Sequence, residues 1–195
     1  MSFFNLYFDL GINHILDFDA YDHILFIITL VAVYYIKQWQ QILVLVTAFT
    51  IGHATTLVLS TLEIIHVNPT YVEFLIPITI LITSIANILV KTTSEINKKL
   101  YYSKYAISVI FGLIHGLGFS SYLQSMLSAA DDLVVPLFAF NLGIEAGQFI
   151  VVSIILMISY VFLSKLKVTQ REWNIFISGA GFGVSLILAL ERWPF

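Results

Sequence analysis

The stretch LVVPLFAFNLGIEAGQFIVVSIILMISYVFL, residues 133–163, decides the fold class of this chain. It contains a single charged residue, Glu145. A spanning helix needs about 20 mostly apolar residues, so this stretch can cross a bilayer with some tilt. Of the 195 residues in the chain, 59% are hydrophobic and 11% are charged, and the mean hydropathy is +0.93. Soluble domains carry about 25% charged residues. The composition therefore indicates an integral membrane protein with one domain.

Five further apolar stretches predict an all-α membrane bundle of about six transmembrane helices. We expect these helices near residues 20–36, 41–62, 71–90, 104–127, 133–163 and 173–190. Residues 1–19 mix aromatic and polar side chains, which is typical of an interfacial segment at the membrane surface. Glycines four residues apart predict close helix contacts and offer faces for a homo-oligomer. These pairs are Gly112/Gly116, Gly143/Gly147 and Gly179/Gly183.

The placement of basic residues predicts the orientation of the bundle. Of the nine Lys and Arg residues, all but Arg192 fall in the first, third and fifth connections between the expected helices. Because basic loops stay in the cytoplasm, both termini should lie on the outer side of a bacterial inner (plasma) membrane. Nucleic-acid binding is not expected, because the basic residues are few and lie at the membrane rim. The outer side gathers acidic residues, which would attract cations. They are Asp9, Asp17, Asp19, Asp22, Asp131 and Asp132.

Histidines and carboxylates occur inside four of the expected helices. Asp22 and His23 open the first, His53 lies in the second, His115 in the fourth and Glu145 in the fifth. Ionisable groups inside a membrane are costly, face the bundle interior and mark functional sites. Imidazoles with carboxylates are the ligand set of Zn, Ni or Co, and a chain without Cys is a poor host for soft Cu(I). We therefore expect these five residues to form one intramembrane metal site.

Other polar residues would support this site or its entrance. Asn141 and Gln148 share a helical face with Glu145, at spacings of four and three residues. His14, Asp17 and Asp19 precede the first expected helix and would assist at an entrance. A purely structural alternative is a scaffold in which the buried polar groups form hydrogen bonds between helices and hold no metal.

Five motifs of the chain resemble those of the HupE/UreJ family, the hydrogenase and urease accessory membrane proteins. They are HILDFDAYDHILF (14–26), TAFTIGHATTL (47–57), VEFLIP (72–77), GLIHGLGF (112–119) and FNLGIEAGQ (140–148). The resemblance implies a nickel or cobalt permease. The family's His-spacer-Asp-His hallmark maps onto His14, Asp22 and His23, with a spacer of seven residues that is longer than usual. Its second hallmark, a His in a glycine-flanked helix, maps onto His115.

The sequence leaves two functions open. The leading hypothesis is a divalent transition-metal permease, or a metal-binding membrane protein, in the lipid bilayer. The alternative is a zinc-dependent membrane hydrolase acting on a lipid-like substrate, with Glu145 or Asp22 as the general base beside a zinc-bound water. A permease needs a polar route to both sides of the membrane. The sparse polarity of the inner helix halves is the main observation against it.

Overall fold

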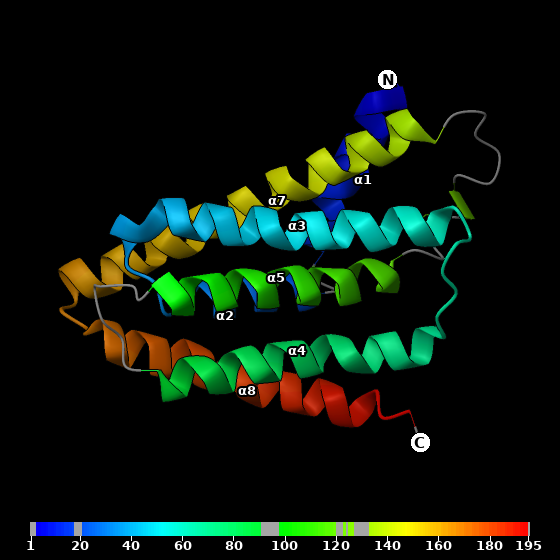
Figure 1. Cartoon of the computed structure of the whole chain (residues 1–195). Coiled ribbons are helices and arrows are strands. Elements are labelled where there is room, and N and C mark those ends of the chain that lie inside the picture. The colour runs from blue at the N-terminus through cyan, green and yellow to red at the C-terminus, as the bar shows by residue number, and fades with distance from the viewer. Residues whose placement is uncertain are drawn as a thin grey trace.

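The computed structural model describes residues 3–17, 21–90, 98–119, 123, 125–126 and 133–194. Within these ranges all regular structure is helical, which confirms the all-α class (Figure 1). The main helices are α1 (Phe3–Leu16), α2 (Asp22–Val31), α3 (Trp39–Thr61), α4 (Pro69–Leu89), α5 (Lys98–Gly118), α7 (Val134–Tyr160) and α8 (Gln170–Glu191). A 3-10 turn, η1 (Ile36–Gln38), leads into α3, and a π-helical segment, η2 (Val161–Lys165), extends α7.

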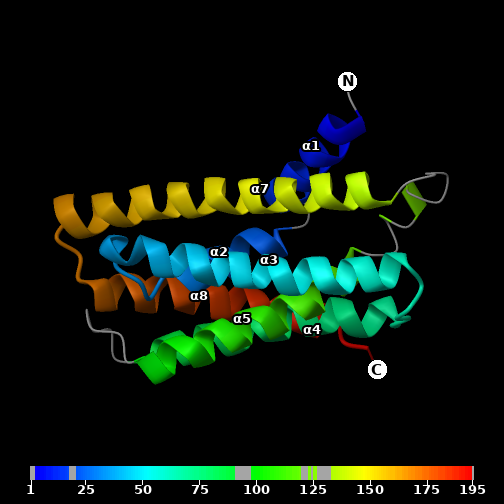
Figure 2. The same ribbon diagram turned by 45° about the horizontal axis from the view of Figure 1, so that its top comes forward.

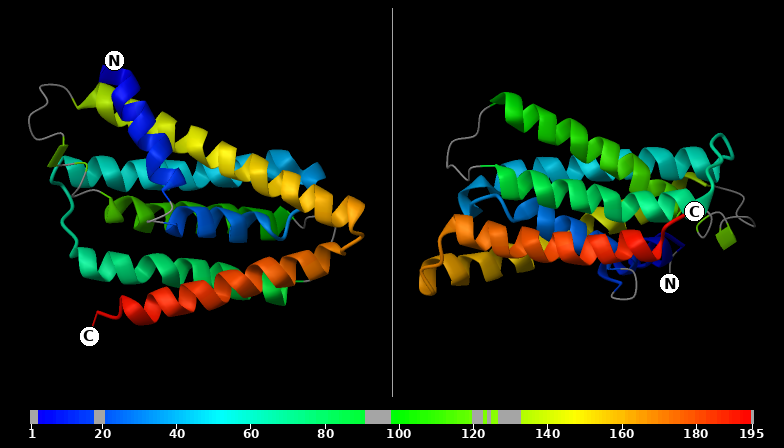
Figure 3. Two further views of the ribbon diagram at one scale, coloured as in Figure 1. Left: turned by 180° about the vertical axis from the view of Figure 1, so that it is seen from behind. Right: turned by 90° about the horizontal axis from the view of Figure 1, so that it is seen from below.

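The helices pack mainly in three pairs: α1 against α7, α3 against α5, and α4 against α8. The longer helices run roughly side by side, and α1 begins at the same end of the bundle at which α8 finishes (Figures 1 and 2). We call this the terminal end. The opposite, basic end carries the α7–α8 connection and the start of α3, as the reverse view in Figure 3 also shows. Its described basic residues are Lys37, Lys98, Lys99, Lys104, Lys165, Lys167 and Arg171. The side of the membrane that each end faces stays a prediction.

Among the described residues, four helical segments are long and apolar enough to cross a membrane, as expected of an integral membrane protein. They cover Ile36–Thr61, Pro69–Leu89, Val134–Lys165 and Gln170–Glu191. Helix α2 has only 10 residues. At a rise of about 1.5 Å per residue it reaches roughly half of a 30 Å hydrocarbon core. The total of six crossings therefore stays a prediction.

The first expected helix, over residues 20–36, is shorter than predicted and ends at Val31. The reason lies in α8. The side-chain amide of Gln170 donates to the carbonyl oxygens of Ala32 and Tyr34, at 3.0 and 2.9 Å. Buried carbonyls that leave a helix need such partners in an apolar environment. Gln170 thus stabilises an early break that the apolar run from residue 31 to 36 does not reveal.

Three other helix boundaries also differ from the prediction. Helix α5 covers Lys98–Gly118 rather than 104–127, and Gly118 and the neighbouring Gly116 weaken the helix at its end. Helix α7 continues beyond residue 160 as the π-helical segment η2. Helix α8 begins at Gln170 rather than 173 because Thr169 and Glu172 form a capping box, in which each side chain bonds the other residue's backbone.

The segment before the first expected span forms helix α1, which lies along α7. Its buried face consists of Tyr7, Gly11 and Ile15. Helices α1 and α2 run one after the other from the terminal end towards the basic end (Figure 1). They are two short helices with a break between Leu16 and Asp22, inside the bundle. The interfacial location expected for residues 1–19 stays a prediction.

Glycines allow two of the helix pairs to touch backbone to backbone. A Cβ atom on Gly112 would collide with the carbonyl oxygen of Phe49 in α3, and one on Gly52 with that of Val109 in α5. Gly11 and Gly143 make the same reciprocal contacts between α1 and α7. Such approach is the known use of small residues in membrane helices. By contrast, a Cβ atom on Gly179 or Gly183 would have no other part of the described chain within 4 Å, so a homo-oligomer through that face stays a prediction.

The glycine contacts predict a difference between two matched substitutions. Gly112→Ala should lower the thermal unfolding temperature in detergent, because overpacking costs about 1–3 kcal/mol. Gly179→Ala adds the same methyl group to open space and should leave that temperature unchanged or raise it slightly, since Ala favours helix. Equal unfolding temperatures for the two variants would contradict the tight α3–α5 contact.

Candidate metal site

Four histidines from four different helices meet in the bundle. One ring nitrogen each of His14 (α1), His23 (α2) and His53 (α3) lies within 4.8 Å of the others. The ring of His115 (α5) is centred 5.3 Å from that of His23. We call His14, His23 and His53 the histidine triad. Three of these four histidines belong to the predicted site, and His14, expected only at the entrance, lies inside the group.

The histidine nitrogens are buried and largely without hydrogen-bond partners. His53 and His115 have no exposed surface, and His23 is 6% exposed. Within the described part of the chain, both ring nitrogens of His23 and of His53 lack a partner, as do Nε2 of His14 and Nδ1 of His115. A buried imidazole left unpaired is unfavourable, since almost all buried polar groups are satisfied. The orphaned nitrogens are therefore the feature that points to a ligand with affinity for imidazole.

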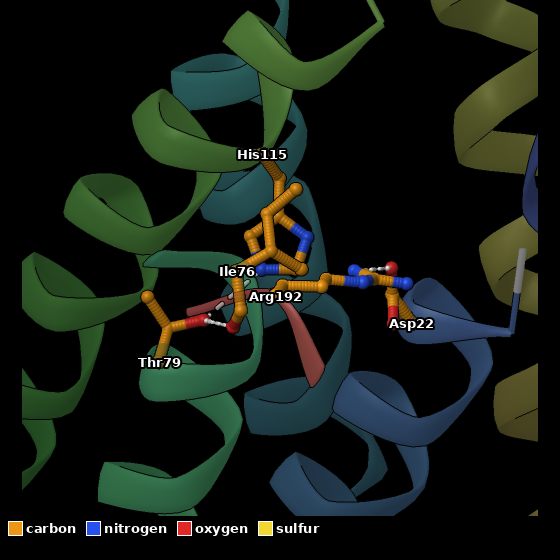
Figure 4. A network of polar contacts seen from close by, with 5 residues as sticks. All are labelled: Asp22, Ile76, Thr79, His115 and Arg192. Carbon is orange, nitrogen blue, oxygen red and sulfur yellow. Dashed lines mark hydrogen bonds and ion pairs between the residues drawn. The ribbon is translucent and has the colours of Figure 1, made fainter. Parts of the chain in front are cut away.

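Thr79 of α4 fixes the orientation of the His115 ring, as Figure 4 shows. Its hydroxyl donates to the carbonyl oxygen of Ile76 at 2.7 Å and lies 3.0 Å from Nε2 of His115. A hydroxyl has one proton, so with that proton on Ile76 the Thr79 oxygen accepts from His115 Nε2–H. The lone pair of His115 is then on Nδ1. Metal-binding histidines are commonly held in this way through their other nitrogen.

Phenylalanines line the histidine group and keep it apolar. Phe119 lies 4.0 Å from His14 between ring centres and stacks on Phe140 at 5.2 Å. Phe26 and Phe49 contact the ring of His115 at 5.3 and 5.1 Å. These rings offer no ligand atoms, and they limit the polar groups that can compete for the imidazoles. In such surroundings electrostatic interactions with a cation are stronger than in water.

A pocket of about 370 Å³ joins the histidines to the surface at the terminal end. His14, His23 and His115 line its inner part together with three carboxylates, Asp17, Asp22 and Glu73, and with one cation, Arg192. Asp22 is paired with Arg192 at 2.8 Å (Figure 4). Asp17 also lines this pocket, and its role at an entrance stays a prediction. Asp19 lies outside the described residues.

Glu145, predicted to join the histidines, lies elsewhere. Its carboxylate accepts a hydrogen bond from Thr47 at 2.8 Å, and Gln148 accepts one from Thr50 at 2.7 Å. Helix α3 runs towards the terminal end, so Thr47 and Thr50 lie one to two turns closer to the basic end than His53. Asn141 bonds the carbonyl of Leu137 in its own helix. The predicted helical face exists, but it forms a separate polar layer between α3 and α7.

Sequence reasoning missed a second buried polar group, between α2, α4 and α8. Asn87 donates to the Thr29 carbonyl at 2.7 Å, and Asn174 donates to the Asn87 carbonyl at 2.8 Å. Ser178 donates to Asn174 at 3.0 Å. These amides bond the backbones of neighbouring helices, which is a structural role. The apolar helix patterns of α4 and α8 give no signal of this contact.

Comparison with known proteins supports the resemblance seen in the motifs. The family model described as HupE / UreJ protein matches residues 1–192 of the chain. No curated protein and no solved structure matches the chain.

The Thr79–His115 contact predicts a coupling that can be measured. Thr79→Val leaves the Nε2–H of His115 buried without an acceptor, which should cost about 1–3 kcal/mol of unfolding free energy. The same substitution in a His115→Phe background should cost clearly less, because Phe needs no partner. Thr55→Val is the matched control, since the exposed Thr55 hydroxyl bonds only its own helix at Ile51. Equal costs of Thr79→Val in both backgrounds, measured by chemical unfolding, would contradict the assigned role.

Proposed function

The chain belongs to the HupE/UreJ family, and we propose that it is a permease for a divalent transition-metal ion of the nickel, cobalt or zinc type. The observation that carries the proposal is the histidine triad, whose ring nitrogens converge within 4.8 Å while lacking other partners. Nitrogen atoms bound to one ion at about 2.0–2.1 Å lie at most about 4.2 Å apart, so the three rings would move slightly closer together to bind a single ion. The metal is the substrate of the protein in this proposal.

The ligand set favours borderline metal ions. His14, His23 and His53 supply imidazole nitrogens, and His115 offers Nδ1 beside them. Mg²⁺ and Ca²⁺ prefer oxygen ligands, whereas Zn²⁺, Ni²⁺ and Co²⁺ accept imidazole readily. Asp22, next to His23 in sequence, would add a carboxylate at the mouth of the pocket. Mixed ligation of this kind permits release as well as binding, which transport requires.

A route from the triad towards the basic end would use the layer formed by Glu145, Gln148, Thr47 and Thr50. All four present oxygen atoms, and the Thr47 and Thr50 hydroxyls already bond the two acceptors. We assign Glu145 and Gln148 to a second metal-binding position of lower affinity on this route. Asn141 would lie beside this position without binding the metal. Passage from nitrogen to oxygen ligands would lower the affinity for a borderline metal and so favour its onward movement.

The hydrolase alternative finds no support in the described residues. Its two candidate bases have other partners: Asp22 is paired with Arg192, and Glu145 with Thr47 in the separate polar layer. A general base must reach the zinc-bound water within about 3 Å or through one further water. We therefore do not pursue a catalytic role.

Binding of Co²⁺ to the purified protein tests the proposal, because its visible spectrum reports the ligands. We expect saturable binding in wild type. Single His14→Ala, His23→Ala and His53→Ala variants should each lose more than roughly tenfold in affinity, since even residues behind metal ligands contribute 10–100-fold. His66→Ala, in the exposed α3–α4 connection, should bind as wild type. Uptake of Co²⁺ into vesicles should fall in the same three variants. Absence of saturable binding in wild type would overturn the proposal.

A further inference from the structure

An ion pair lies in the wall of the pocket that leads to the histidine triad. Nη1 of Arg192, the residue that follows α8, lies 2.8 Å from Oδ2 of Asp22, the first residue of α2. The Asp22 side chain is 12% exposed and that of Arg192 is 29% exposed. Both residues line the pocket together with His14, His23 and His115, and Figure 4 shows the ion pair beside His115. The guanidinium therefore holds a positive charge at the place where an arriving cation would meet its first carboxylate.

This position is unusual for a basic residue. Among the described residues Arg192 is the one Lys or Arg at the terminal end, whereas the others lie towards the basic end: Lys37, Lys98, Lys99, Lys104, Lys165, Lys167 and Arg171. It sits among three carboxylates of one pocket, those of Asp17, Asp22 and Glu73. A fixed positive charge next to a cation site lowers the affinity of that site, because like charges repel strongly where water is scarce. Arg192 therefore does not serve to attract a metal cation to the pocket, because its own charge is positive.

The surroundings allow the Arg192 side chain to move while its backbone stays in place. Trp193 packs edge-on against Phe74 of α4, with ring centres 5.2 Å apart, and the Arg192 amide is bonded to Leu188 in α8. Glu73, one residue before Phe74, is exposed and lines the same pocket. Within the described part of the chain its carboxylate has no hydrogen-bond or ion-pair partner. It is a second acceptor for a displaced guanidinium.

We propose that Arg192 is an internal competitor cation, which occupies Asp22 until a divalent metal ion displaces it towards Glu73. This inference rests on the proposed function and adds to it a residue that sets affinity and selectivity. A monovalent ion brings Asp22 no more charge than the guanidinium already supplies. A divalent ion brings twice that charge and can also bind imidazole, so it competes better. The ion pair thus discriminates against Na⁺ and K⁺ at the entrance.

A purely structural ion pair makes the opposite prediction. If Arg192 only held Asp22 and α2 in place for binding, its neutralisation would loosen the site and weaken metal affinity. If Arg192 competes with the metal, its neutralisation frees Asp22 and strengthens affinity. The apparent dissociation constant equals the intrinsic one divided by the fraction of protein in which Asp22 is available. With Asp22 available about a tenth of the time, release would tighten binding about tenfold.

The test is titration of the full-length, detergent-purified protein with Co²⁺ in 100 mM KCl, about physiological ionic strength. We expect Arg192→Gln to bind Co²⁺ about tenfold more tightly than wild type. Arg192→Met, which keeps the aliphatic stem of the side chain, should do the same and provides a second neutral variant. Arg192→Lys retains the charge and should lie between wild type and Arg192→Gln. Arg171→Gln, the same change at the other end of α8, should leave the affinity unchanged.

Competition by Na⁺ provides a second readout. Raising NaCl should weaken Co²⁺ binding more in Arg192→Gln than in wild type, because the freed Asp22 then accepts monovalent ions. Unchanged or weaker Co²⁺ affinity in both neutral variants, with intact wild-type binding, would overturn the role of Arg192 and leave the proposed function standing. Absence of Co²⁺ binding in wild type and in all variants would overturn both proposals.

Discussion

Backbone contact at glycines is the constraint on which the rest of this structure depends. The α3–α5 pair closes through Gly52 and Gly112, and the α1–α7 pair through Gly11 and Gly143. A side chain at any of these positions would collide with a carbonyl oxygen of the opposite helix. Because four histidines from four helices must meet, small errors in helix spacing would separate them. Gly116, next to His115, lies against the backbone of His53 itself, so helix packing and the geometry of the histidine group are set by the same contact.

The buried polar groups fall into two kinds, and the difference separates structure from function. Gln170, Asn87 and Asn174 donate to backbone carbonyls of neighbouring helices, and these bonds stabilise a helix end or a helix pair. The ring nitrogens of His23 and His53 have no such partner among the described residues. Buried groups that stay unpaired are unfavourable unless water or another ligand binds them. This difference in hydrogen bonding, rather than residue type, is the observation on which the proposed metal site rests.

Much of the fold and part of the candidate site could be predicted from the sequence. Apolar length located the helices, and the cost of burying ionisable groups singled out His23, His53 and His115. Three features could not be predicted, for separate physical reasons. Helical periodicity placed Glu145, Gln148 and Asn141 on one face but could not say that this face meets Thr47 rather than the histidines. The sequence spacing from His14 to Asp22 did not reveal that His14 lies among the other histidines, because these two residues belong to separate helices. The pairing of Asp22 with Arg192 joins residues 170 positions apart, and only the solitary basic residue at the acidic end hinted at it.

The break between α1 and α2 gives the histidine group an electrostatic setting that a continuous helix would not provide. The last turn of α1 carries His14, and the partial negative charge of this helix end lies near the triad, which favours a cation. The first turn of α2 carries Asp22, whose charge offsets the partial positive charge at that helix start. Broken helices that meet at an ion site are a recurrent device of secondary transporters, because their ends supply polar groups within the membrane without exposing backbone to lipid. His14 and His23 lie on separate helices and approach from different directions, so that one short segment of chain supplies two imidazoles and two carboxylates, those of Asp17 and Asp22, to the pocket.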